Sequence, residues 1–301
     1  VKFSGNFGLF ATKFNIASNK MTQSKSKLTL IEVLAKTTYQ VQITKSSNKE
    51  FDRPIAFGSG FLVNYKNELI FVTADHNIHI EDYELYERTG IDNVASIFNN
   101  ISKKEEFSTL LTPVGPFYYM EKFDITKPNE KPELFDVAIC LMNKEKIEAP
   151  FLTEQINDHN GNVLVQPNEP KFTFSEEQMV EATTNDHYFI YGKIKPEIRT
   201  VFLHRIDTMK ENITFIQQSG DYLLFNTNEI ITDGKDWSGL SGSAVLNQEG
   251  NCVGVLCSIN EGTKSIWVKS IQKVKVLMDV AILQEQLANE KSTTGNNVYK
   301  K

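Results

Sequence analysis

Most of the chain consists of short segments in which apolar, β-branched and aromatic residues cluster or alternate with polar ones. Runs of about four to eight such residues between turn-forming residues are typical of β-strands. Two of them, 56–64 and 68–73, flank the turn-like Tyr65-Lys66-Asn67 and predict a β-hairpin. Further strands are predicted at 38–44, 134–141, 162–165, 187–191, 222–226, 244–246, 252–259 and 265–268.

Helical patterns are confined to the two ends of this strand-rich region. Residues 28–34 predict a short helix, and apolar residues recur at helical spacing from about 270 to 288: Ile271, Val274, Leu277, Val280 or Ala281, and Leu287. Many short strands with almost no long amphipathic helix between them favour an all-β fold, a closed antiparallel barrel or a sandwich, over an α/β fold. We therefore expect a β-rich core closed by one C-terminal helix.

The same pattern sets the expected boundaries. No internal repeat of fixed period and no long low-complexity linker divides the chain, which predicts a single two-lobed domain over 27–290. Residues 1–26 are interpreted as a leader outside the fold, because the first 31 residues contain five lysines and no acid, and Val1 rather than Met begins the chain. We expect this leader to be vector-derived or translated from upstream of Met21, with a trimmed targeting segment as the alternative. Residues 291–301 are expected to form a polar tail.

Composition narrows the partners. The formal net charge of −6 argues against a nucleic-acid partner, because clustered Lys and Arg supply affinity for phosphate backbones. No run approaches the roughly 18 apolar residues that span a bilayer, so no membrane partner is expected. The three cysteines are too few for a disulfide framework, which predicts buried free thiols and a reducing, cytoplasmic location. They do not cluster with histidines, and neither a metal site nor a cofactor is expected.

A glycine-rich turn carries the first candidate for chemistry. Gly239-Leu240-Ser241-Gly242-Ser243-Ala244-Val245 sets a serine between glycines just before a β-branched strand. Small neighbours let the backbone turn sharply and leave the amides of Gly239 and Ser241 free to point at one site. Similar strings occur in plain turns, and Ser59 in Gly58-Ser59-Gly60 is expected to be structural. Ser241 becomes a candidate nucleophile only if a base and a carboxylate accompany it.

Two other strings supply that base and carboxylate. Phe71-Val72-Thr73-Ala74-Asp75-His76 places His76 at the end of an apolar strand; His79 is a rival without this strand-end position. Leu134-Phe135-Asp136-Val137-Ala138-Ile139 places Asp136 at the opening of another apolar strand. A carboxylate there is costly to bury without a hydrogen-bonding partner, and an imidazole is a suitable one. The three side chains together predict a His76/Asp136/Ser241 triad.

Jointly, the three strings resemble the Thr-Ala-Ala-His, Asp-(Ile/Val)-Ala and Gly-Asx-Ser-Gly-Gly motifs of the chymotrypsin/trypsin superfamily of serine proteases, in the same chain order. Gly58-Ser59-Gly60-Phe61 and Cys257-Ser258-Ile259-Asn260 resemble two further family segments, so the resemblance covers roughly 50–275. It implies two antiparallel six-stranded β-barrels with the active site between them and a C-terminal helix packed outside. It also implies a serine endopeptidase that acts on peptide or protein substrates, with a regulatory partner as an open question.

The resemblance assigns roles to individual residues. Ser241 would attack the scissile carbonyl, His76 would take and return the proton, and Asp136 would hold the imidazole tautomer, while the amides of Gly239 and Ser241 would bind the oxyanion. Lys235, six residues before the serine, would lie at the base of the specificity pocket. The same mapping gives the pocket walls as Ser258, Asn260 and Ser265.

Lys235 predicts a preference for an acidic residue before the cleaved bond, unless it reaches solvent or is neutralised by Asp236. Leu240 stands where digestive members of the family carry an aspartate that pairs with a newly cleaved N-terminus, so that route of activation is not expected. Two other interpretations are compatible with the sequence. One is a catalytically silent member of the same fold that binds a peptide or protein partner, and the other is an unrelated β-rich binding module with coincidental motifs.

Overall fold

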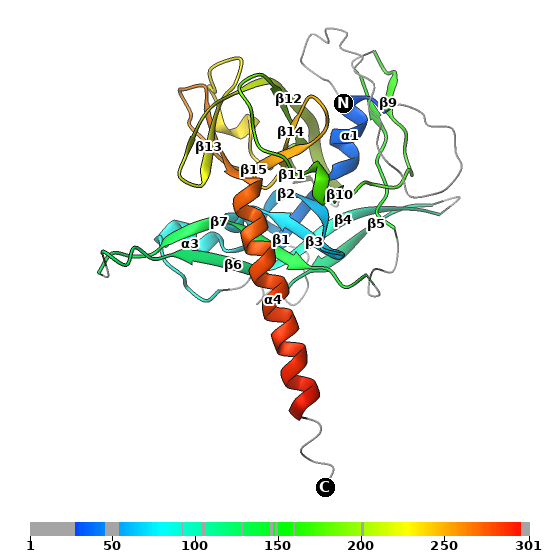
Figure 1. Cartoon of the computed structure of the whole chain (residues 1–301). Coiled ribbons are helices and arrows are strands. Elements are labelled where there is room, and N and C mark those ends of the chain that lie inside the picture. The colour runs from blue at the N-terminus through cyan, green and yellow to red at the C-terminus, as the bar shows by residue number, and fades with distance from the viewer. Residues whose placement is uncertain are drawn as a thin grey trace.

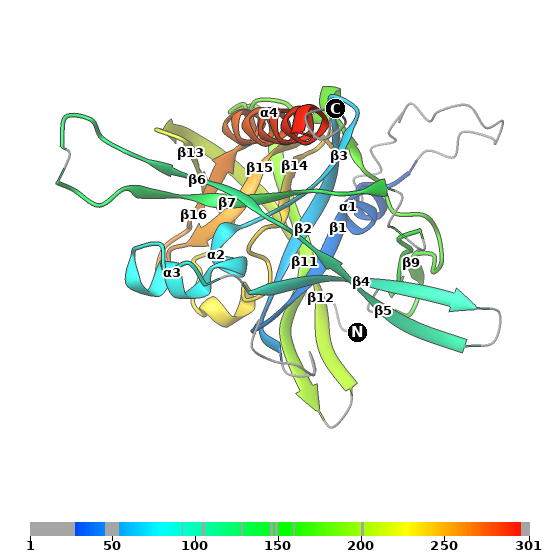
Figure 2. The ribbon, with the colours of Figure 1, turned by 90° about the horizontal axis from the view of Figure 1, so that it is seen from below.

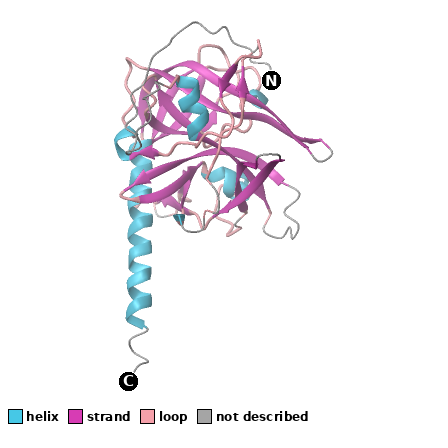
Figure 3. Cartoon of the chain, turned by 90° about the vertical axis from the view of Figure 1, so that its right-hand side faces the viewer, coloured by secondary structure: helices cyan, strands magenta, loops and turns pink. Residues whose placement is uncertain are grey.

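The computed structural model describes residues 28–45, 54–91, 93–103, 106–127, 129–144, 147, 150–158, 160–199 and 202–295. The expected leader at 1–26 and the end of the expected tail, 296–301, lie outside these ranges. The described chain folds into two β-lobes that pack against each other, with one long helix beside them (Figures 1 and 3). The all-β class and the C-terminal helix predicted from the sequence are confirmed.

The N-terminal lobe is an eight-stranded sheet in the order β5-β4-β1-β2-β3-β7-β6, with β10 pairing parallel to β2. All neighbours along the main path are antiparallel. Within the described residues, no pairing joins β5 to β6, so this lobe differs from the six-stranded barrel that the resemblance implied. The β4–β5 hairpin projects from the lobe (Figure 2). The strands are β1 (Thr38–Thr44), β2 (Pro54–Tyr65), β3 (Glu68–Thr73), β4 (Val94–Lys103), β5 (Glu106–Val114), β6 (Tyr118–Lys122), β7 (Glu133–Leu141) and β10 (Phe174–Ser175).

The C-terminal lobe is a closed barrel of six strands in the order β11-β12-β13-β16-β15-β14. Pairing of Tyr188 with Asn247 and of Ile190 with Val245 closes it between β11 and β14. Burial alternates along β13, where Leu223 and Phe225 face the core, as expected for a strand with one buried face. The strands are β11 (His187–Arg199), β12 (Phe202–Ser219), β13 (Tyr222–Asn226), β14 (Ala244–Asn247), β15 (Cys252–Ile259) and β16 (Ser265–Ser270).

Few helices accompany these sheets. The first, α1 (Leu30–Thr37), begins with a capping box in which Thr29 and Glu32 bond each other's backbone amides. The others in the described chain are α2 (Asp75–Ile78), α3 (Ile80–Leu85), η2 (Glu176–Gln178), η3 (Gly234–Asp236) and α4 (Ile271–Gly295), and a small separate sheet pairs β8 (Ile156–Asn157) with β9 (Val163–Val165). Among the described residues, no helix has the length and apolar character needed to cross a membrane.

The C-terminal helix α4 ties the two lobes together. It contacts β6 and β7 of the first lobe and β15 and β16 of the second. Its buried residues recur at helical spacing and share one apolar cluster with residues of both lobes: Ile271, Val274, Leu277, Met278 and Ala281. Beyond them Leu283 and Leu287 are exposed, and the helix continues to Gly295, past the predicted end at 288, projecting from the body of the molecule (Figure 1).

Candidate active site

His76 and Asp136 form a hydrogen-bonded pair between α2 and β7. The Nδ1 atom of His76 lies 2.8 Å from Oδ1 and 2.9 Å from Oδ2 of Asp136, and the His76 amide donates to Oδ1 over 3.1 Å. The side chain of Asp136 is 10% exposed and that of His76 is 27% exposed. Because the carboxylate occupies Nδ1, the proton of a neutral imidazole is held there and Nε2 is left to accept another proton.

The electrostatics of this pair favour a basic imidazole. Burial acts to lower the pKa of His76, because it penalises the charged form. The negative charge of Asp136 and its hydrogen bond, together with the charge of Asp75, act in the opposite direction and leave the pKa raised above its ordinary value. A histidine with this environment can accept a proton and hold it as an ion pair.

Ser241 lies in the tight turn between η3 and β14, beside the helix that carries His76. Its carbonyl accepts hydrogen bonds from the Ser59 amide at 2.8 Å and from Nδ2 of Asn77 at 2.9 Å. Asn77 follows His76 in α2 and also donates to Oγ1 of Thr73, over 3.1 Å. These bonds fix the backbone of the serine against the end of β3 and the start of α2, across the boundary between the lobes.

Of Ser59, Ser241 and Ser243, only Ser241 has a hydroxyl without a hydrogen bond to a described residue. Ser59 is buried and donates its hydroxyl to the carbonyl of Gly239 at 2.7 Å, which supports the expected structural role. Ser243 is also buried and donates to the carbonyl of Tyr191 at 3.2 Å. Ser241 is half-buried, and its Oγ has no hydrogen bond to any residue that the structure describes.

Two glycines give the turn its path. Gly239 has φ +103° and Gly242 has φ +88°, a region that residues with a Cβ rarely adopt. A Cβ added to Gly239 would lie 2.4 Å from the carbonyl oxygen of Lys193, and one added to Gly242 would lie 2.1 Å from that of Ser59. Both positions therefore require glycine for backbone conformation and for space.

The amides of this turn divide into two groups. Those of Leu240, Gly242 and Ser243 donate to backbone carbonyls at 2.8–3.0 Å, and that of Ser238 donates over 3.3 Å. The amides of Gly239 and Ser241 have no acceptor among the described residues. Two free amides beside a serine hydroxyl are the donors that an oxyanion requires.

The rival histidine, His79, belongs to a second, buried pair. Its Nδ1 lies 2.6 Å from Oδ1 of Asp75, and its side chain is 3% exposed. Asp75 also accepts from the Tyr83 hydroxyl at 3.0 Å and pairs with Arg88 at 2.7 Å. The Tyr83 ring meets His76 edge-on, with centroids 5.7 Å apart, so this network packs directly behind the exposed imidazole.

The structure brings together three of the four residues expected to bind substrate. Ser258, Asn260 and Ser265 lie together at one end of β15 and β16, where the Asn260 amide donates to the Ser265 carbonyl at 2.9 Å. Lys235 is exposed in η3. Asp236, considered above as its neutralising partner, instead pairs with Lys195 at 2.5 Å. η3 approaches the β15–β16 turn, since a Cβ on Gly234 would lie 3.1 Å from Oε2 of Glu261.

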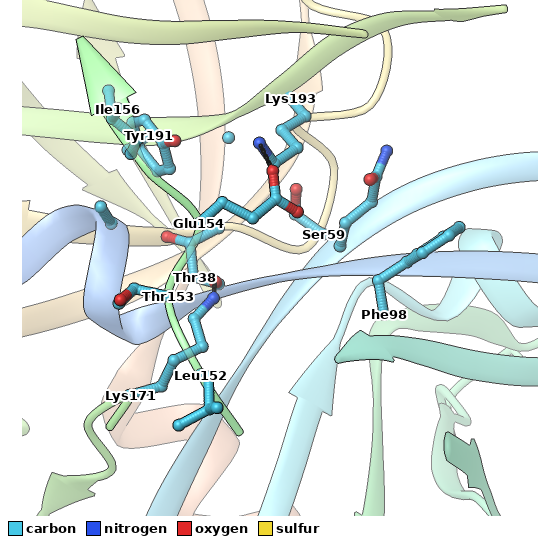
Figure 4. Close-up of a pocket in the computed structure, with 13 residues that line it drawn as sticks. Thr38, Ser59, Phe98, Leu152, Thr153, Glu154, Ile156, Lys171, Tyr191 and Lys193 are labelled. Carbon is cyan, nitrogen blue, oxygen red and sulfur yellow. Dashed lines mark hydrogen bonds and ion pairs between the residues drawn. The ribbon is translucent and has the colours of Figure 1, made fainter. Parts of the chain in front are cut away.

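A small polar cavity of about 40 Å³ lies behind Ser59, between the lobes. Figure 4 shows the side chains of Lys193 and Glu154 meeting in its lining, with Lys171 beside Thr38. The Nζ atom of Lys193 is 2.9 Å from Glu154 and 2.7 Å from Asp207. The Ser59 hydroxyl donates to the Gly239 carbonyl and the backbone of Lys193 lies close to Gly239, so two residues that line this cavity also pack against the turn that carries the free amides.

Some contacts at the site involve residues that the motifs did not indicate. Asn77 holds the serine backbone, and the thiol of Cys257 donates to the carbonyl of Asp136 at 3.1 Å, joining β15 to β7. Cys140, Cys252 and Cys257 are buried and free, as predicted. In the described part of the chain, no group of three or more His, Cys, Asp or Glu side chains is placed to hold a metal ion.

Comparison with known proteins finds no matching family model and no matching curated protein. Solved structures similar to this chain include the protease of tobacco vein mottling virus, at 10% identity and TM-score 0.41, over 83% of each chain. The serine endoprotease from Yersinia pestis matches at 11% identity and TM-score 0.40, over 85% of this chain and 67% of that one. Deg5 matches at 11% identity and TM-score 0.40, over 81% and 88%.

Proposed function

We propose that this protein is a serine endopeptidase that hydrolyses peptide bonds through an acyl-enzyme on Ser241. The observation that carries the proposal is the hydrogen-bonded His76–Asp136 pair, placed beside Ser241, whose own amide and that of Gly239 have no acceptor among the described residues. The four functions that acyl transfer needs are a nucleophile, a base, a group that orients the base and an oxyanion site. This constellation offers a residue for each.

In the proposed reaction, Nε2 of His76 takes the proton of the Ser241 hydroxyl as Oγ attacks the scissile carbonyl. Asp136 keeps the Nδ1 proton in place and stabilises the imidazolium that forms. The amides of Gly239 and Ser241 bind the developing oxyanion. His76 then protonates the leaving amine, and a water molecule activated by the same imidazole releases the acyl group. Hydrogen bonds between nucleophile and base are often long without substrate, so the unbonded Ser241 Oγ is compatible with this sequence of steps.

The test is covalent labelling by a fluorophosphonate, which reacts quickly only with an activated serine. Ser241→Ala removes only the proposed nucleophile, so labelling should be lost, and peptide hydrolysis should fall by about 10⁴–10⁶. Ser238→Ala is the matched control, because Ser238 is an exposed serine of the same turn and should label like the wild type.

Two results would contradict the proposal. Labelling that survives in Ser241→Ala would show that another residue is the nucleophile. A folded wild-type protein that is never labelled would instead favour a silent fold that binds a peptide or protein partner. His76→Ala should abolish labelling, whereas loss in His79→Ala with retention in His76→Ala would identify the other histidine as the base.

The specificity of the proposed enzyme is a separate question. The exposed Lys235 is the candidate to pair with an acidic side chain before the cleaved bond, and Asp236 is occupied by Lys195. Glu261 near Gly234 places a carboxylate close to the same loop and opposes such a preference. Cleavage of a peptide library by the wild type and by Lys235→Glu decides between them. An unchanged cleavage-site preference in Lys235→Glu would exclude Lys235 from the specificity pocket and would leave the proposed triad unaffected.

A further inference from the structure

Lys269 is a buried lysine that the proposed reaction does not use. It lies on β16, pairs with Tyr222 of β13 and Val255 of β15, and has a relative exposure of 0%. Its Nζ lies 3.4 Å from the ring centroid of Tyr222 and 4.3 Å from that of Phe135. No hydrogen-bond acceptor for this ammonium exists among the described residues.

An ammonium in such a place is unfavourable by itself. Removal from water without an acceptor penalises the charged form, and two aromatic faces offset only part of that penalty. An apolar side chain of similar length would fill the space at lower cost. The lysine therefore needs a further source of stabilisation, namely negative charge in its surroundings.

The groups that act on Lys269 come from four neighbouring strands. From β7 there are the carboxylates of Asp136 and Glu133, and from β6 the ammonium of Lys122. Tyr222 faces it from β13 and the thiol of Cys257 from β15. Burial raises the pKa of that thiol well above its ordinary value, so Cys257 is neutral and carries no charge at neutral pH.

Asp136 is the member of this set that belongs to the active site. Phe135, whose ring covers the ammonium, immediately precedes Asp136 on β7. Cys257, which acts on Lys269, donates its thiol to the Asp136 carbonyl. The ammonium thus lies among side chains that adjoin Asp136: the ring of the preceding residue and the thiol bonded to its carbonyl.

We propose that Lys269 is a positioning residue for the proposed reaction, and that its buried ammonium balances part of the charge of Asp136, so that a larger fraction of His76 is neutral in the resting enzyme. This inference rests on the proposed function of His76 as the base. Without a counter-charge, Asp136 favours the protonated imidazolium, and a histidine that is already protonated cannot accept the serine proton. A second cation near the carboxylate opposes that protonation.

The charge of Lys269 is itself sensitive to pH. Burial lowers its pKa to about 8; Cys257, Asp136 and Glu133 oppose this effect and the charge of Lys122 adds to it. Near neutral pH the ammonium is present, and it is lost as the pH rises through about 8. The carboxylate then acts on His76 without its counter-charge.

The test is an NMR titration of His76 in the Ser241→Ala background, with the signal identified by its loss in His76→Gln. Lys269→Met removes the charge and keeps the length of the side chain, so the titration midpoint of His76 should move to higher pH. Lys269→Arg keeps the charge and should leave the midpoint near that of the parent. Lys273→Met is the matched control, because it removes an equal charge from a side chain that is 45% exposed, and it should not move the midpoint.

An unchanged midpoint in Lys269→Met would overturn the inference, as would an equal shift in the arginine variant, since packing alone would then be the cause. If Lys269→Met does not fold, the Ser241→Ala protein that retains Lys269 still tests the coupling. Its His76 signal should show a small second inflection near pH 8, and the absence of that inflection would refute the coupling. None of these measurements requires hydrolysis. If the protein is never labelled by a fluorophosphonate but the His76 midpoint shifts in Lys269→Met, the proposed function is refuted and the coupling between Lys269 and His76 stands.

Discussion

Gly242→Ala tests whether the serine turn depends on close packing between the lobes. The added methyl group would lie 2.1 Å from the Ser59 carbonyl oxygen, 2.6 Å from Oγ1 of Thr73 and 2.8 Å from the amide nitrogen of Ala74. Two of these three atoms belong to the backbone, so no side-chain rotation relieves the overlap. The turn must move away from the strand end that leads to His76.

The expected cost has two parts. A residue with a Cβ at φ +88° loses about 1–2 kcal/mol, and inserting a methyl group into a packed site costs about 1–3 kcal/mol more. Gly262→Ala isolates the first part, because Gly262 has φ +80° and an added Cβ would have no atom within 4 Å. We therefore expect Gly262→Ala to lower the free energy of unfolding by about 1–2 kcal/mol and Gly242→Ala by roughly 2–5 kcal/mol.

Thermal denaturation of both variants beside the wild type measures the difference, and fluorophosphonate labelling measures its effect on Ser241. The Gly262 variant should label at the wild-type rate, whereas the Gly242 variant should label far more slowly at a temperature where it is still folded. Equal destabilisation of the two variants would refute the steric argument. Normal labelling of Gly242→Ala would show that the turn tolerates displacement.

Other consequences follow from the same contacts. Asp136→Asn should lower turnover by around 10⁴ near neutral pH, because an amide favours the wrong imidazole tautomer, and a loss below about tenfold would assign the orienting role to another carboxylate. Hydrolysis needs neutral His76, and the pKa of that residue is raised. As the pH is lowered, kcat/KM should therefore fall with a midpoint above the ordinary pKa of imidazole. A midpoint below that value would contradict the assignment of charges around His76. Asp75→Asn should shift this midpoint to lower pH, since it removes one of the charges that raise the His76 pKa. Reductant should leave the melting temperature unchanged, because the cysteines in the structure are free, and a marked fall would reveal a bridge.

Elements with a strong local signal were predictable from the sequence. The hairpin of β2 and β3 was predictable because apolar segments flank a turn in which Lys66 and Asn67 adopt positive φ. The strands β4, β5, β6 and β12 were not predicted. Among the described side chains of β12 only Asp207 and Ile213 are buried, so burial imposes little period on its sequence. In β4 an inward position is filled by Asn99, whose side chain bonds Pro150 and Leu152 instead of packing in an apolar core.

The candidate site divides in the same manner. His76 follows the end of β3, Ser241 lies in a turn and Asp136 lies within the apolar strand β7, and such local patterns can be recognised one at a time. Lys269 had no such pattern, because a lysine in a strand ordinarily faces solvent and its burial depends on rings from two other strands. Contacts of this kind exist only after the lobes have packed.

The two hydrogen bonds to the Ser241 carbonyl have a consequence for how the molecule loses activity. Their donors, Ser59 and Asn77, belong to the first lobe, whereas the serine belongs to the second. A modest rotation of one lobe would break both bonds and separate nucleophile from base while each sheet kept its own ladder of backbone bonds. In a denaturant series, the labelling rate should therefore decline before the far-ultraviolet circular dichroism changes. Labelling of Ser241 would then report separation of the two lobes rather than unfolding of either one.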